Sequence, residues 1–217
     1  MMIKAIQFSP YKPIEMFDTF VPEAVQLTLA EGVIREYKNA KILCETEFNP
    51  AESVDLLPHF RRACIESMLC ELSKRHSEVR ILRRLNANRN CSHRLVFCGR
   101  VMLTQSLVER KKTLPREAIY RESYAHDPQY SLFGEEEPPI EDAPLYGIIS
   151  HMPVSGRDNG IASFVDIVFP DKEYKIIVGR VPLLDRFPGI VDAVYATDQE
   201  KIPDSIKAQL RARKEKA

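Results

Sequence analysis

The stretch DLLPHFRRACIESMLCELSKR, residues 55–75, decides the fold. Apolar side chains recur in it every four residues with further apolar residues beside them, at Phe60, Cys64, Met68 and Leu72 and at Leu57, Ile65 and Leu69. This spacing places a broad apolar stripe along one side of an α-helix. We therefore predict a helix over residues 55–75 that lies at the centre of the core.

A second helix is predicted over residues 22–37. Its apolar residues again share one helical face: Val25, Leu29, Val33, Ile34 and Tyr37. Pro22 stands at its start, where a helix tolerates proline because the first N–H groups have no partner within the helix. Short strands are expected on either side, over residues 2–8 and 41–46, and Asn49-Pro50 breaks the chain after the second.

Most of the remaining sequence has the pattern of β-structure. Residues 93–110 are rich in Leu, Val, Phe and Thr and predict one long strand. Runs at 146–151, 162–169 and 174–181 predict an antiparallel meander, with an Asn-Gly turn at 159–160 between the first two. A short helix is expected over 114–124. The arginine-rich stretch 78–94 has little periodicity and a turn-prone centre at 86–90.

Together these patterns predict an α+β fold, in which two main helices pack on a mostly antiparallel sheet and a three-stranded meander follows near the C-terminus. A chain of 217 residues is long for one average domain and short for two. We expect a single domain over residues 1–200, with an exposed loop at 125–144 rich in proline and glutamate. A charged tail at 201–217 completes the chain.

The charge balance excludes a bulk attraction for nucleic acid or for an anionic membrane, because Lys and Arg number 31 and so do Asp and Glu. Local patches remain, since residues 75–121 are strongly basic and residues 135–142 include five acidic side chains. No stretch approaches the roughly 20 apolar residues that span a bilayer, and no export signal is visible. We expect a cytoplasmic protein without a membrane partner.

The five cysteines and five histidines form no recognisable metal or catalytic signature. No two cysteines stand in a CxxC pair, and an odd number of scattered thiols is typical of a reducing cytosol. The histidine spacings do not match two metal ligands four residues apart on a helix. We therefore expect no metal site, no cofactor and no catalytic residue.

A short apolar island lies inside the acidic loop and reads Gln129, Tyr130, Ser131, Leu132 and Phe133. It resembles the peptide motif that binds the bacterial DNA polymerase sliding clamp, the beta subunit, in which a glutamine and a final Leu-Phe pair recur. Such a peptide inserts Leu and Phe into an apolar pocket, and a few buried anchors carry most of its affinity. We predict these five residues as a partner-binding site, with burial in the protein's own core as the alternative.

The motif and the chain length also resemble the SocB-like family of bacterial toxins. The resemblance implies a non-enzymatic protein that inhibits DNA replication by occupying the sliding clamp. It further implies an antitoxin that acts as a protease adaptor for the toxin. Carried over to this chain, it assigns the clamp contacts to Gln129, Leu132 and Phe133, with Tyr130 and Ser131 secondary.

A second hypothesis is an RNA-binding or RNA-cleaving toxin that uses the basic region 80–121. The predicted nucleic-acid contacts are Arg80, Arg83, Arg84 and Arg94, because arginine binds phosphate. Cleavage would require proton transfer and stabilisation of phosphate charge, and suitable groups are His93, His126, Arg94, Arg116, Arg121 and Tyr124. A third hypothesis is a regulatory or phage-encoded binding module whose partner is unrelated to the clamp and whose core contains the QYSLF segment.

Overall fold

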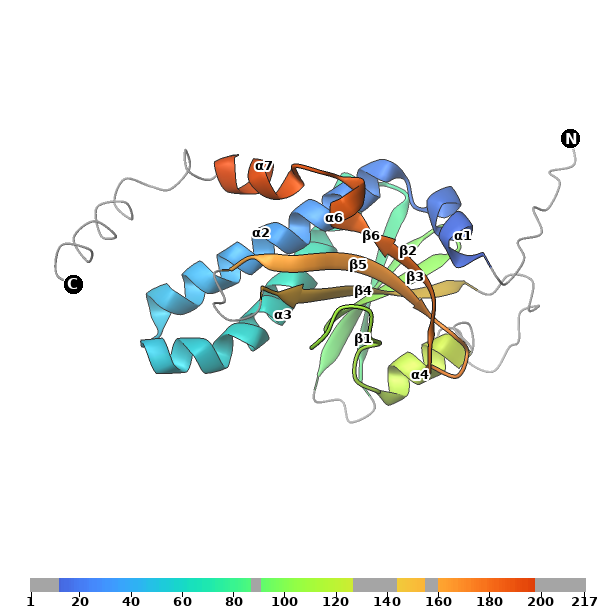
Figure 1. The fold of residues 1–217 in the computed structure, drawn as a ribbon. Coiled ribbons are helices and arrows are strands. Elements are labelled where there is room, and N and C mark those ends of the chain that lie inside the picture. The colour runs from blue at the N-terminus through green and yellow to red at the C-terminus, as the bar shows by residue number, and fades with distance from the viewer. Residues whose placement is uncertain (1–11, 87–90, 127–143, 155–159, 198–217) are drawn as a thin grey trace, which may run out of the picture.

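The computed structural model describes residues 12–86, 91–126, 144–154 and 160–197. Two long helices, α2 and α3, pack side by side along a sheet (Figure 1). The helices are α1 Pro13–Phe20, α2 Glu23–Glu47, α3 Pro50–Arg75, α4 Ile119–His126, α6 Leu183–Arg186 and α7 Ile190–Thr197. The strands are β1 Val79–Leu85, β2 Ser92–Cys98, β3 Val101–Leu107, β4 Leu145–Pro153, β5 Ala162–Pro170 and β6 Ile177–Pro182. Among the described residues, no helix combines the length and the apolar character needed to cross a membrane.

The six strands lie in chain order, from β1 at one edge of the sheet to β6 at the other. Neighbouring strands are antiparallel except β3 and β4, which run parallel with Leu107 opposite His151. A parallel pair requires a crossover connection, and α4 lies within this one. The structure confirms the predicted α+β class, its two main helices, its mostly antiparallel sheet and the meander β4–β6.

Apolar side chains at alternate strand positions form a core on each face of the sheet. On one face, Val96 and Leu103 belong to a large cluster with buried residues of α2 and α3. On the opposite face, Leu95 and Ile148 pack with Tyr124 of α4. The two long helices therefore cover one face of the sheet, and α4 covers part of the other.

The central helix α3 was predicted at residues 55–75 and begins earlier, at Pro50. Asn49 caps its N-terminus, because the Asn49 side chain accepts a hydrogen bond from the backbone N–H of Glu52 at 3.1 Å. Pro50 occupies the first turn, where its missing N–H costs nothing. The Asn49-Pro50 pair, predicted as a chain break, therefore also starts the helix.

The predicted strand at residues 41–46 is wrong, because α2 continues through this stretch. Ala40 and Cys44 extend the buried face of the helix beyond Tyr37, at spacings of three and four residues, and pack against α3. Ile42 and Leu43 are exposed on the outer side of the same turns. Packing against α3 thus determines the conformation of this segment.

The single strand predicted at residues 93–110 is also wrong, because the chain turns at Gly99 and forms β2 and β3. Gly99 has a φ of +53°, and a Cβ there would lie 2.6 Å from Cδ1 of Phe20. The helix predicted at 114–124 lies further along the chain, as α4 at Ile119–His126. The stretch 78–94, for which no element was predicted, contains β1. The predicted strand 2–8, most of the loop 125–144 and the tail 201–217 lie outside the described residues.

Candidate functional site

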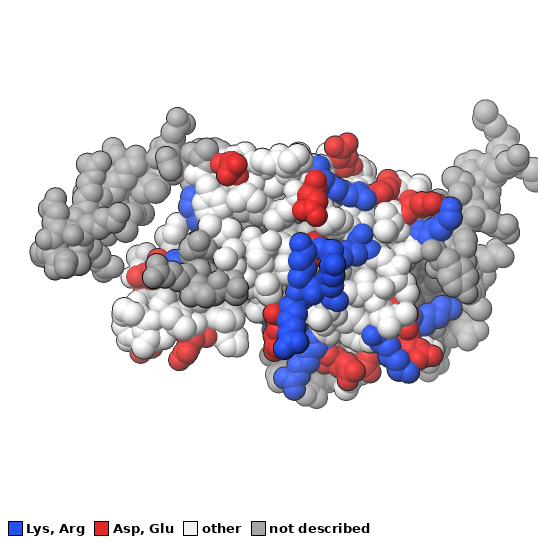
Figure 2. Space-filling view, viewed as in Figure 1, with Lys and Arg blue, Asp and Glu red and all other residues white. Residues whose placement is uncertain are grey.

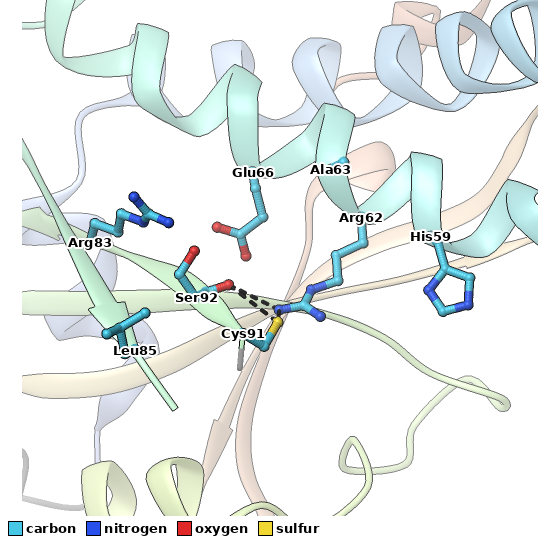
Figure 3. Close-up of a pocket in the computed structure, with 8 residues that line it drawn as sticks. All are labelled: His59, Arg62, Ala63, Glu66, Arg83, Leu85, Cys91 and Ser92. Atoms are coloured by element: carbon cyan, nitrogen blue, oxygen red, sulfur yellow. Dashed lines mark hydrogen bonds between the residues drawn. The ribbon is translucent and has the colours of Figure 1, made fainter. Parts of the chain in front are cut away.

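A pocket opens between α3 and the hairpin of β1 and β2 (Figure 3), and we call it the hairpin pocket. Its volume is about 430 Å³, within the range of roughly 300–1,000 Å³ typical of small-molecule sites. Helix α3 supplies one wall, and the end of β1 and the start of β2 supply the other. Its lining includes Arg62, Glu66, Arg83, Leu85, Cys91 and Ser92.

Two exposed arginines flank the hairpin pocket. Arg62 of α3 donates from Nη2 to the backbone oxygen of Ser92 at 3.0 Å. Arg83 of β1 makes no hydrogen bond or ion pair with any other described residue. Since a guanidinium group presents five N–H donors, both side chains retain donors for an anion.

Glu66 projects from α3 toward the strands, between Arg62 and Arg83 (Figure 3). Its Oε2 accepts the backbone N–H of Arg94 at 2.8 Å, and its Oε1 accepts from Gln105 Nε2 at 3.0 Å. Burial raises the pKa of this carboxyl, while the hydrogen bond from Gln105 and the nearby arginines act in the opposite direction. Glu66 therefore joins α3 to β2 and β3 and lines the pocket at the same time.

Behind Glu66, a chain of hydrogen bonds crosses the core, and we call it the polar relay. Oε1 of Gln105 lies 3.0 Å from Nε2 of His151, and Nδ1 of His151 lies 2.7 Å from the Tyr37 hydroxyl. Because Oε1 of Gln105 accepts, His151 donates from Nε2 and its Nδ1 accepts from Tyr37. Burial, together with the positive charge of Arg61, lowers the pKa of His151 to about 3. With His151 neutral, Tyr37 donates to His151, His151 donates to Gln105, and Gln105 donates to Glu66.

An aromatic cluster occupies the opposite face of β2, next to α4. The His93 and Tyr120 rings are stacked, with centroids 4.2 Å apart and an interplanar angle of 19°. Nε2 of His93 lies 3.2 Å from the Tyr124 hydroxyl, and the Arg121 guanidinium lies 5.1 Å from the centre of the Tyr120 ring. The three aromatic rings and the cation form one continuous set of contacts.

The electrostatics of His93 show that arginines from three elements gather near the start of β2. The pKa of His93 is lowered to about 4, chiefly by burial and then by the positive charges of Arg121, Arg62 and Arg84. These arginines belong to α4, α3 and β1, in that order. Arginines therefore lie on both faces of the sheet near the β1–β2 hairpin.

The four arginines predicted to contact nucleic acid do not form one patch. In a strand, successive side chains point to opposite faces, so Arg83 of β1 and Arg94 of β2 lie on the α3 side. Arg80 and Arg84 lie on the α4 side. Arg94 is also engaged internally, because its Nε donates to Sγ of Cys70 at 2.9 Å. Of the four, only Arg83 lines the hairpin pocket.

The structure brings together three of the groups considered for RNA cleavage, namely His93, Arg121 and Tyr124. Arg116 is exposed, and its backbone oxygen accepts a hydrogen bond from Arg121 Nη1 at 2.7 Å. His126 is exposed at the C-terminal end of α4. Arg94 lies on the other face of β2. The predicted partner-binding residues Gln129, Tyr130, Ser131, Leu132 and Phe133 lie outside the described residues.

Sequence reasoning missed the functional candidates Arg62, Glu66, Gln105 and His151. Arg62 and Glu66 stand four residues apart and therefore share a face of α3. Gln105 and His151 are buried polar residues within strands that are otherwise largely apolar. Buried polar side chains nearly always have hydrogen-bond partners, so their presence in β-patterned segments was a signal of an internal network.

A further basic surface is visible in Figure 2, where Lys and Arg side chains gather in a band at the middle of one face. The segment that follows β3 carries three consecutive exposed basic residues, Arg110, Lys111 and Lys112. Lys111 Nζ lies 5.7 Å from the centre of the Phe164 ring on β5. Within the ranges that the structure describes, no group of His, Cys, Asp and Glu side chains could hold a metal ion.

No protein-family model matches this chain, and neither the curated proteins nor the solved structures contain a significant match to it.

Proposed function

We propose that this protein binds single-stranded RNA, with the hairpin pocket as its contact site. The observation that carries the proposal is that two exposed arginines, Arg62 and Arg83, line one pocket, and that Arg83 has no acidic partner among the described residues. Arg62 contributes from α3 on the other side of the pocket. Arginines that line an exposed pocket from two sides are a typical phosphate-binding arrangement.

The pocket shape favours a single strand over a duplex. Unpaired bases turn outward and insert into pockets, whereas a duplex presents mainly its backbone. The hairpin pocket offers apolar surface as well as charge, since the Leu85 side chain is 52% exposed and Ala63 lies across from it. An exposed leucine that lines a pocket provides a surface for the flat face of a base.

Binding without cleavage fits the aromatic cluster best. General acid catalysis at neutral pH requires a group that is protonated there and can reach the substrate. With its pKa lowered to about 4, His93 is neutral at pH 7, and only 4% of its surface is exposed. Tyr124 keeps its phenolic proton because burial raises its pKa, but only 4% of its surface is exposed, so its hydroxyl does not reach a substrate either. The cluster therefore supports β2 and α4 rather than transferring protons.

Fluorescence anisotropy with a labelled single-stranded RNA, measured over a series of salt concentrations, tests the proposal. The double variant Arg62→Ala/Arg83→Ala removes the two arginines that line the pocket. Its affinity should fall, and the slope of log K against log salt should decrease by about 1.4, because each phosphate contact to a single strand contributes about 0.7.

The matched control removes the same number of charges from the far end of α3. Lys74→Ala/Arg75→Ala alters two exposed side chains that do not line the pocket. This control should keep the wild-type slope. Absence of RNA binding by the intact protein, or an equal loss in both double variants, would reject the hairpin pocket as an RNA site.

A second proposal rests on the sequence motif: Gln129, Leu132 and Phe133 dock on the bacterial sliding clamp, and the protein thereby inhibits replication as a toxin. The motif falls in the connection between α4 and β4. Calorimetry with purified clamp should show binding that Leu132→Ala/Phe133→Ala abolishes and that Arg62→Ala/Arg83→Ala leaves intact. Intact protein that fails to bind the clamp would end this proposal without affecting the first.

A further inference from the structure

A carboxylate in the middle of a phosphate-binding pocket needs an explanation, because it repels the phosphate that its neighbours attract. Glu66 is such a group, since it lines the hairpin pocket together with Arg62 and Arg83. Two arginines alone would bind phosphate more strongly without it. Glu66 therefore has either a purely structural role or a role in recognising another part of the ligand.

The contacts of Glu66 leave acceptor positions unused. A carboxylate offers about four lone-pair sites. Among the described residues, Oε2 accepts one hydrogen bond from the Arg94 backbone and Oε1 accepts one from Gln105. Each oxygen thus has one protein donor and one remaining site. A ligand that presents two N–H groups side by side would satisfy both sites at once.

The polar relay fixes the orientation of these acceptors. Gln105 holds Oε1 by donating its amide N–H, and His151 holds the Gln105 amide in that orientation by donating to its carbonyl oxygen. Tyr37 completes the relay from α2. Because Gln105 and His151 are buried, Glu66 presents a preorganised pair of acceptor atoms rather than a flexible side chain.

Only one of the four RNA bases presents two adjacent donors on its Watson–Crick edge. Guanine does so with N1–H and the N2 amino group, whereas adenine and cytosine pair one amino group with a ring acceptor, and uracil has one N–H between two carbonyl oxygens. We propose that Glu66 recognises a guanine base of the bound RNA through N1–H and N2–H. This inference rests on the proposed RNA binding and adds its base specificity.

The remaining pocket residues fit a guanosine in this orientation. Leu85 and Ala63 offer apolar surface to the ring, and Arg62 and Arg83 lie on the two sides of Glu66, within reach of the adjoining phosphates. Guanine is neutral, so its N–H groups compensate the carboxylate by hydrogen bonding while the arginines compensate the phosphates. Each charged group of the pocket then has a partner in the complex.

The test compares two labelled RNA heptamers that differ only in one base, guanosine against inosine, which lacks the N2 amino group. The protein variants are wild type, Glu66→Gln and the matched control Glu71→Gln, which lies on the exposed surface of the same helix. Wild type and Glu71→Gln should bind the guanosine RNA about five- to tenfold more tightly than the inosine RNA. In Glu66→Gln, the difference should fall to less than about twofold.

The outcomes separate the two proposals. Equal binding of both RNAs by wild type, or an unchanged preference in a folded Glu66→Gln variant, would overturn guanine recognition while leaving RNA binding in place. Failure to bind either RNA would instead reject RNA binding itself. Thermal unfolding of Glu66→Gln shows whether the variant is folded, and the inosine comparison in wild type tests the inference independently of any substitution.

Discussion

Acidification should destabilise this protein in a way that can be worked out from two buried histidines. His151 and His93 have pKa values of about 3 and about 4 in the folded protein, below the ordinary value of 6.5, because burial disfavours the charged imidazole. Unfolding exposes both rings to water. Between about pH 6.5 and about pH 4 the unfolded chain therefore binds more protons than the folded protein, and stability falls as the pH falls.

The magnitude follows from the proton uptake of the unfolded state. Between about pH 7.5 and about pH 5.5, an exposed histidine takes up most of one proton, whereas His151 and His93 remain neutral in the fold. Each ring should lower the free energy of unfolding by about 1.3 kcal/mol, or about 2.6 kcal/mol together. Burial raises the pKa values of Glu66 and Asp166, so the folded protein binds protons at these carboxyls more readily than the unfolded chain. Their contribution to the free energy of unfolding therefore increases as the pH falls, opposite to that of the histidines.

Urea unfolding at several pH values measures the effect, and His151→Gln isolates one histidine. The glutamine keeps a donor toward Gln105 and an acceptor toward Tyr37 but takes up no proton. Subtracting the free energy of unfolding of the variant from that of wild type cancels the carboxyl contributions. This difference should change by about 1.3 kcal/mol over this pH range. A difference that stays constant with pH would refute the buried, neutral state of His151.

Two further predictions concern the placement of α3. A Cβ on Gly32 of α2 would lie 2.6 Å from Sδ of Met68, so Gly32→Ala should lower the free energy of unfolding by about 1–3 kcal/mol despite the better helix propensity of alanine. Met68→Ala in the same chain should remove part of that loss, as a double-mutant cycle by urea unfolding would measure. Asn49→Ala removes the acceptor of the Glu52 N–H and should cost about 1 kcal/mol, whereas Asn49→Ser should cost much less.

Helical periodicity predicted the two helices that organise the fold, because their buried faces are long enough to outweigh local ambiguity. The stripe around Ile65 and Leu69 is buried against the sheet as expected. The local sequence pattern predicted the wrong element at residues 41–46, where Ala40 and Cys44 pack against α3 and the chain is helical instead of extended. It failed again at residues 93–110, because the apolar content of β2 and β3 conceals the turn at Gly99.

The hairpin pocket could not be predicted from sequence, because its residues meet only through tertiary structure. Gln105 stands 39 residues from Glu66 and 46 residues from His151. The arginines were easy to find, but the alternation of β1 sends Arg83 and Arg84 to opposite faces of the sheet. A count of basic residues therefore indicated a basic region and not which of its members share a site.

Photo-crosslinking locates RNA on the protein most directly. The probe is a single-stranded RNA that carries 4-thiouridine beside a guanosine, and mass spectrometry identifies the linked peptides. We predict links to His59 on α3 or to Cys91 before β2, both of which line the hairpin pocket, with the yield lost in Arg62→Ala/Arg83→Ala. Links confined to other surfaces, such as the basic segment 110–112, or a yield unchanged in the double variant, would contradict RNA binding at this pocket.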